Sequence, residues 1–138
     1  YFSLYSNVKE FMNNTVAEAR ECGYTLTMFN RRRYLPDLKS DNRQVRESAE
    51  RIAINSPIQG SAADLIKVAM IRLSRKLKKL KLNSKMILQV HDELVFECPV
   101  SEKKEIESLV RKEMEGASTL SVPLVVDIGW GKNWHEAH

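Results

Sequence analysis

Three adjacent polar residues, His91, Asp92 and Glu93, stand between two short apolar runs. The runs, Met86–Val90 and Leu94–Phe96, are rich in β-branched and aromatic side chains, so the pattern predicts a buried β-hairpin with the acids at its tip. Carboxylates on a rigid hairpin can bind a divalent cation such as Mg²⁺, which takes oxygen ligands and keeps waters and phosphates in its shell. Turns also favour Asp for reasons unrelated to any site, so this stretch by itself leaves both interpretations open.

The composition is that of one folded domain of ordinary size. The 138 residues are 43% hydrophobic and 29% charged, with few glycines and prolines, which argues against a disordered or fibrous chain. No long apolar segment and no signal-peptide pattern occurs, so we expect a cytoplasmic protein with no membrane partner. Cys22 and Cys98 are isolated, which favours reduced thiols over a disulfide or a zinc site. The chain does not begin with Met, and we interpret it as a piece of a longer polypeptide.

The rest of the sequence predicts the helices and hairpins that position the acidic tip. Apolar residues at steps of three and four indicate helices, and alternating residues indicate strands. Hairpins with helices between them indicate an α+β fold, in which antiparallel β-hairpins have helices packed on one face. In chain order we expect a helix over residues 4–22 stopped by Gly23, a hairpin over Tyr24–Pro36, a helix from Ser40 or Asp41 to Ile54, a helix that starts with the capping box Ser56-Pro57-Ile58-Gln59, the central hairpin, a helix capped by Ser101 that ends near Gly116, and a strand over Leu124–Gly129.

Basic residues gather at two places, although the formal net charge is only +4. Arg31, Arg32 and Arg33 follow one another, and in a strand Arg31 and Arg33 share one face while Arg32 takes the other. This run can hold a phosphate on one side and an internal carboxylate on the other, or it can be a charged edge strand that resists aggregation. The second group is either a phosphate-facing patch on a helix or an ordinary solvated face, and its members are Arg72, Arg75, Lys76, Lys78, Lys79 and Lys81.

Five stretches match one enzyme family in the right order: Gly23-Tyr24, Arg31–Asp37, Glu50–Lys67, Gln89–Glu97, and Gly129–Trp134 with Ala137-His138. Together they resemble the C-terminal part of a family A DNA polymerase of the bacterial DNA polymerase I type. The resemblance covers the chain from about residue 1 to the last. It implies that residues 1 to about 36 form the end of the fingers with the basic hairpin, and that residues from about 37 to 138 form the palm. It also implies a nucleoid-associated protein of DNA replication and repair.

The resemblance assigns the acidic tip to motif C of the palm. Asp92, with Glu93 beside it, would then be catalytic and would help to hold two Mg²⁺ ions. In nucleotidyl transfer such ions stabilise the attacking and the leaving oxygen, and the protein mainly contributes positioning and charge. By the same resemblance, His91 would lie next to the primer terminus.

The resemblance also implies a set of DNA-binding residues. Arg51, Asn55 and Gln59 would lie along the minor groove of the primer–template DNA, where acceptors occur on every base pair and need no sequence reading. Arg46 and Lys67 would face the DNA backbone. Gln59 cannot serve both the expected capping box and the DNA with the same atoms, and we prefer the DNA role.

The family's other metal-binding Asp belongs to a motif upstream of this sequence, as do the fingers residues that bind the incoming deoxynucleoside triphosphate. We therefore expect the 138-residue chain alone to bind Mg²⁺ weakly and not to polymerise DNA, while its parent does. Surface that the upstream part normally covers would then allow the fragment to self-associate. Two other functions fit the same residues: a DNA-binding module without catalysis, and a metal-dependent nuclease, although no His or Lys stands as an evident base for hydrolysis.

Overall fold

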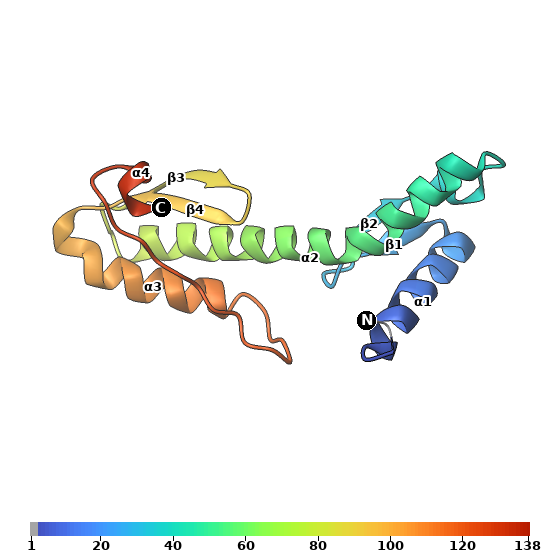
Figure 1. The fold of residues 1–138 in the computed structure, drawn as a ribbon. Helices are drawn as coiled ribbons and strands as arrows, with labels where there is room; N and C mark the ends of the chain where they lie inside the picture. The colour runs from blue at the N-terminus through green and yellow to red at the C-terminus, as the bar shows by residue number, and fades with distance from the viewer. Residues whose placement is uncertain (1–2) are drawn as a thin grey trace. The chain divides into compact units, whose positions relative to one another are not determined.

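The computed structural model describes residues 3–138 and confirms an α+β fold of helices and two small antiparallel sheets (Figure 1). Tyr1 and Phe2, the first residues of the expected fingers segment, lie outside the described residues. The chain forms two compact units, one that ends at Asp64 and one over Leu65–His138. In the described part of the chain, no helix is long and apolar enough to cross a membrane.

The first unit packs α1 (Ser6–Cys22) and the beginning of α2 (Arg43–Lys79) around a small core. α1 ends at Gly23 as predicted, in a left-handed conformation with φ of 87° that glycine adopts without strain. The predicted first hairpin is also present, with β1 (Tyr24–Leu26) and β2 (Arg32–Tyr34) paired antiparallel and followed by the 3-10 helix η1 (Pro36–Lys39). The core residues are Ala19, Leu35, Leu38, Ala49 and Ala53.

α2 is one helix of 37 residues, so the prediction of two helices separated at Asn55-Ser56-Pro57 is wrong. A proline inside a helix removes one backbone hydrogen bond and crowds the preceding turn, at a cost of about 3 kcal/mol. Here the helix packs on both sides of Pro57, because Ala53 before it and Asp64 after it are buried. Tertiary packing therefore outweighs the local signal for a break, as it often does. The expected capping box does not form, and Ser61 Oγ instead donates a hydrogen bond to Pro57 O.

Two other helix caps also differ from the prediction. Asn42, and not Ser40 or Asp41, caps α2, because Asn42 Oδ1 accepts hydrogen bonds from the N–H groups of Gln44 and Val45. Ser101 does not cap α3 (Lys103–Glu115). It lies within the 3-10 helix η2 (Val100–Glu102), which leads into α3 without a side-chain cap.

In the second unit, α3 and the central hairpin both pack against the C-terminal half of α2 (Figure 1). The hairpin consists of β3 (Lys85–Val90) and β4 (Glu93–Glu97), paired antiparallel as predicted. The prediction that the hairpin is buried is wrong for part of β3, because Ile87 and Leu88 are 56% and 45% exposed. The core contains Leu73, Leu77, Ile106 and Val110, with Leu94, Phe96, Ile128 and Trp130 packed against it.

The predicted last strand is absent, since residues 124–129 pair with no strand of the described chain. Side chains of α3 instead bind the backbone of this segment. Arg111 Nη1 donates to Val126 O at 2.6 Å, and Val126 N–H donates to Glu115 Oε1 at 3.0 Å. An unpredicted short helix, α4 (Trp134–Ala137), follows. α4 lies so close to the chain before it that a Cβ added to Gly129 would collide with Ala137 O.

Candidate metal-binding tip and nucleic-acid interface

The acidic tip is a tight turn between two paired strands of the second unit. Val90 pairs with Glu93, so His91 and Asp92 form the turn, and His91 has a positive φ of 52°. His91 and Asp92 are exposed, and Glu93 begins β4 with its side chain 40% exposed. The sequence prediction that the acids stand at a hairpin tip is therefore confirmed.

Within residues 3–138, Glu93 has one side-chain partner at the tip. His138 Nδ1 lies 3.2 Å from Glu93 Oε1. Among residues 3–138, Asp92 forms no hydrogen bond or ion pair through its side chain. Sequence reasoning did not connect His138 with the tip, because the contact depends on the path of the last ten residues, and no periodic pattern signals that path.

Asp92 and Glu93 are the type of ligand that Mg²⁺ prefers, but two carboxylates are too few to complete its coordination shell. Mg²⁺ takes oxygen ligands in a nearly ideal octahedron, and Asp92 and Glu93 offer such oxygens. However, no group of three or more His, Cys, Asp or Glu that could hold a metal ion occurs within residues 3–138. The tip therefore offers part of a coordination shell.

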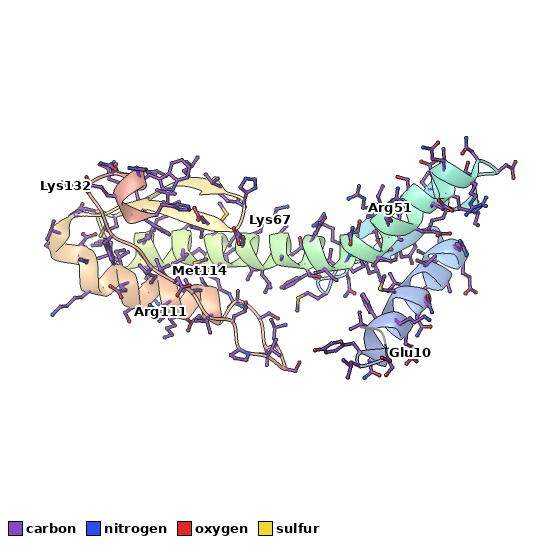
Figure 2. The ribbon with its side chains drawn as sticks, in the orientation of Figure 1. Glu10, Arg51, Lys67, Arg111, Met114 and Lys132 are labelled. Atoms are coloured by element: carbon purple, nitrogen blue, oxygen red, sulfur yellow. The ribbon has the colours of Figure 1, made fainter. Side chains whose placement is uncertain are left out.

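The expected minor-groove residues lie on one exposed face of α2 in the first unit. Arg51, Asn55 and Gln59 follow one another at steps of four, which places them on the same side of a helix. All three are exposed, and Figure 2 labels Arg51 on this stretch of the helix. Their side chains form no hydrogen bond or ion pair within the described residues. Because α2 continues through this region, Gln59 caps no helix, and the alternative role for it is excluded.

The two residues expected to face the DNA backbone differ in their surroundings. Arg46 Nη1 donates to Ser40 O at 2.8 Å, which ties the start of α2 to the turn before it. Lys67 is exposed on the part of α2 that belongs to the second unit (Figure 2). Arg46 therefore has a structural contact, whereas the Lys67 ammonium has no partner in the described chain.

The three consecutive arginines have different partners. Arg31 Nε donates to Asp64 Oδ1 at 2.8 Å, so Asp64 is the internal carboxylate that the sequence suggested for this run. Arg32 lies over the Tyr24 ring, 4.5 Å from its centroid. The Arg33 guanidinium has no hydrogen bond, ion pair or ring contact within residues 3–138.

Asp64 is the centre of a network that sequence reasoning missed. Thr27 Oγ1 donates to Asp64 Oδ2 at 2.6 Å, and Met28 N–H donates to Ser61 Oγ at 2.9 Å. The loop approaches α2 so closely that a Cβ on Gly60 would lie 2.7 Å from Thr27 Cγ2. The small residues that follow Gln59 indicate that another segment approaches this part of α2 closely. In the structure that segment is the β1–β2 loop.

The basic group was expected on one helix, but Lys81 lies beyond the end of α2 with a positive φ of 53°, and the other five members lie on the helix. Leu73 and Leu77 are buried, whereas Arg75, Lys78 and Lys79 are exposed. Arg72 Nη1 donates to Gly116 O at 2.7 Å, which binds this helix to the end of α3. The group therefore combines one structural arginine with several solvated charges.

Comparisons with known proteins agree over nearly the whole chain. The family model described as DNA polymerase family A matches residues 1–136. The chain is 57% identical to DNA polymerase I of Caldicellulosiruptor bescii over 136 residues, which are 99% of this chain and 16% of that protein. It is 53% identical to DNA polymerase I of Mycobacterium leprae over 137 residues, 99% of this chain and 15% of that protein.

A solved structure is similar over the same extent. The POL domain of Pol1 from M. smegmatis, in complex with DNA primer-template and dNTP, superposes with a TM-score of 0.97 at 52% sequence identity, covering 99% of this chain and 24% of that one. The chain thus spans about one sixth of the length of the two DNA polymerase I relatives. The match of the family model and the identity of these relatives show that this chain belongs to DNA polymerase family A.

Proposed function

We propose that this chain is part of the polymerase domain of a DNA-directed DNA polymerase and supplies two of its catalytic carboxylates. The observation that carries the proposal is the tip of the β3–β4 hairpin, where Asp92 is exposed and has no structural partner in the described residues. Membership of family A and the solved relative with primer-template and dNTP support the choice of reaction. Residues 1 to about 36 are assigned to the end of the fingers and the basic hairpin, and the rest to the palm.

Asp92 and Glu93 would hold Mg²⁺ together with ligands from the rest of the polymerase. The ions supply charge stabilisation at the oxygens that attack and leave during nucleotidyl transfer. The contribution of this chain is rigid placement: the two strands fix the backbone at the tip, and His138 beside Glu93 Oε1 restricts that side chain. Because two carboxylates do not complete the shell, the 138-residue chain by itself is not expected to extend a primer.

The row formed by Arg51, Asn55 and Gln59 would grip the minor groove of the primer–template duplex. Its side chains are exposed donors on one helix face and are not engaged within the described chain. Minor-groove acceptors on A·T and T·A pairs occupy similar positions, so such a row can test the shape of a base pair without selecting a sequence. His91, at the turn, would stand next to the primer terminus, and Lys67 and Arg46 would face the backbone.

The test is Asp92→Ala in the complete polymerase polypeptide, with Glu97→Ala as the matched control. Glu97 is an exposed carboxylate on the same hairpin, at the far end from the tip, where its backbone lies opposite Lys85 of β3. Loss of a metal-binding carboxylate removes several kcal/mol of transition-state stabilisation, which corresponds to a loss of primer extension of about 10³-fold or more. Binding of primer–template, measured by fluorescence anisotropy, should change little.

Three results would contradict this assignment. If Asp92→Ala extends primers as well as Glu97→Ala does, the tip is not catalytic. If the wild-type polypeptide binds DNA but neither extends primers nor depends on Asp92 for any reaction, a binding module without catalysis is correct. Hydrolysis of DNA that depends on Asp92, without synthesis, would instead identify a nuclease.

A further inference from the structure

The β1–β2 hairpin and α2 surround a hollow of about 190 Å³ in the first unit, and its lining is positively charged. Three arginines line it together with Gln59, Ser56 and Thr25, and no carboxylate among residues 3–138 belongs to the lining. A cavity needs about 10–15 Å³ by this measure to hold one water molecule, so the hollow has room for several waters. A group of the size of a phosphate therefore fits in it.

Within the described residues, one of the three arginines carries a charge without a partner. Arg31 is paired with Asp64, and Arg32 lies over the Tyr24 ring on the other face of the hairpin. Arg33 is paired in register with Thr25, on the same side as Arg31, and its guanidinium has no partner within the described residues. Arg33 is thus the cation of this hollow that remains available to an outside anion.

Arg33 also borders a second hollow on its other side, whose lining includes Asp37. No ion pair joins Arg33 to Asp37 in the part of the chain that the structure describes. The Asp37 carboxylate therefore does not neutralise the charge of the Arg33 guanidinium through an ion pair.

Two further polar groups of the hollow lack partners. Thr25 Oγ1 is buried and forms no hydrogen bond in the described chain. Buried polar groups in native proteins nearly always have a partner, so an orphaned hydroxyl indicates a wall that a polar ligand or water completes. The Gln59 amide, which lines the same hollow, is also unengaged within residues 3–138.

We propose that Arg33 binds a phosphodiester group of the DNA strand that lies along the Arg51, Asn55 and Gln59 row. This proposal rests on the proposed function, because the row supplies the DNA. The guanidinium fork matches two phosphate oxygens, and such a contact fixes the register of a strand without reading its sequence. Arg33 would therefore bind the phosphate backbone of the DNA, while the Arg51, Asn55 and Gln59 row contacts its minor groove.

The experiment compares Arg33→Ala, Arg33→Lys and Arg43→Ala in the complete polymerase polypeptide. Arg43 is the matched control, because it is an arginine of the same unit that is 83% exposed and paired with Glu47 outside the hollow. The dissociation constant for a primer–template is measured by anisotropy at several salt concentrations, and the KM for dNTP is measured by primer extension.

One lost phosphate contact lowers the slope of log K against log salt by about 0.9, which is roughly an eightfold loss of affinity at 0.1 M salt. We expect this loss for Arg33→Ala, a substantial rescue of the slope by Arg33→Lys, and an unchanged slope for Arg43→Ala. The KM for dNTP should stay the same.

Three results would overturn the proposal. The first is an Arg33→Ala slope equal to that of wild type. The second is the same decrease for Arg43→Ala, which would indicate a general charge effect. The third is a change in the KM for dNTP alone, which would assign the hollow to the phosphates of a free nucleotide. If wild type neither binds DNA nor extends primers, the proposed function itself has failed, and this outcome is distinct from the other three.

Discussion

Replacement of Asp64 by alanine tests whether the network between the β1–β2 loop and α2 stabilises the protein. The Asp64 side chain is only 10% exposed and accepts hydrogen bonds from Thr27 Oγ1 and Arg31 Nε. A buried hydrogen bond to a charged group contributes about 1.5–3 kcal/mol. The Arg31 side chain is 51% exposed, so the ion pair itself is screened by solvent and adds about 0–1 kcal/mol. We therefore expect Asp64→Ala to lower the free energy of unfolding by about 1.5–4 kcal/mol.

The assay is urea denaturation followed by circular dichroism, with Glu47→Ala as the control. Glu47 forms an exposed pair with Arg43 four residues earlier on the same helix, and such pairs contribute about 0.3–0.5 kcal/mol. A double-mutant cycle combines Asp64→Ala with Arg31→Ala. It should assign at most about 1 kcal/mol of the Asp64 effect to the ion pair, because the Arg31→Ala variant keeps the buried hydrogen bond between Thr27 and Asp64. A loss for Asp64→Ala below about 1 kcal/mol, or no larger than that of the control, would refute the reasoning.

Three further substitutions test other parts of the fold. Hydrogen bonds from Ser84 lower the pKa of the Glu102 carboxyl in the folded protein below its ordinary value of 4.5. The ionised carboxylate therefore stabilises the fold above pH 4.5, and this stabilisation is lost as the pH falls through the lowered pKa of the folded protein. The difference in melting temperature between wild type and Glu102→Gln should accordingly disappear in acid. Gly129→Ala should displace α4, because the new Cβ collides with Ala137 O, and faster hydrogen exchange at the Ala137 amide would show this. Pro57→Ala restores a missing helix hydrogen bond and should raise the free energy of unfolding by up to about 3 kcal/mol, measured by urea denaturation.

The sequence could predict the hairpin tip because its signal is local. Two short apolar runs on either side of His91 and Asp92 specify paired strands and a turn, and the pairing of Val90 with Glu93 agrees with this. Gly23 could likewise be predicted as a helix stop, since few other residues adopt a positive φ without strain. Each of these features depends only on neighbouring residues.

The features that the sequence could not predict depend on distant residues. Pro57 is a strong local signal for a helix break, but burial of Ala53 and Asp64 on either side keeps α2 continuous. Residues 124–129 are mostly apolar and β-branched, as a strand would be, yet Arg111 and Glu115 of α3 satisfy the backbone of Val126, so no partner strand is needed. Tertiary contacts decide both cases, and a periodicity cannot show them.

Three carboxylates of the described chain hold the fold through hydrogen bonds, and Asp92 at the tip differs from them. Glu102 and Glu115 accept hydrogen bonds from backbone N–H groups, and Asp64 accepts from Thr27 and Arg31, so each of these three is engaged in holding the fold. Asp92 stands at a turn where the backbone is already fixed by the paired strands, and nothing in the described chain uses its oxygens. Turn chemistry explains why an Asp is tolerated at such a position, but an Asp that bonded to its own turn would have its oxygens engaged. A carboxylate that the fold exposes without using is available to a cation, which is what the proposed metal-binding role of Asp92 requires.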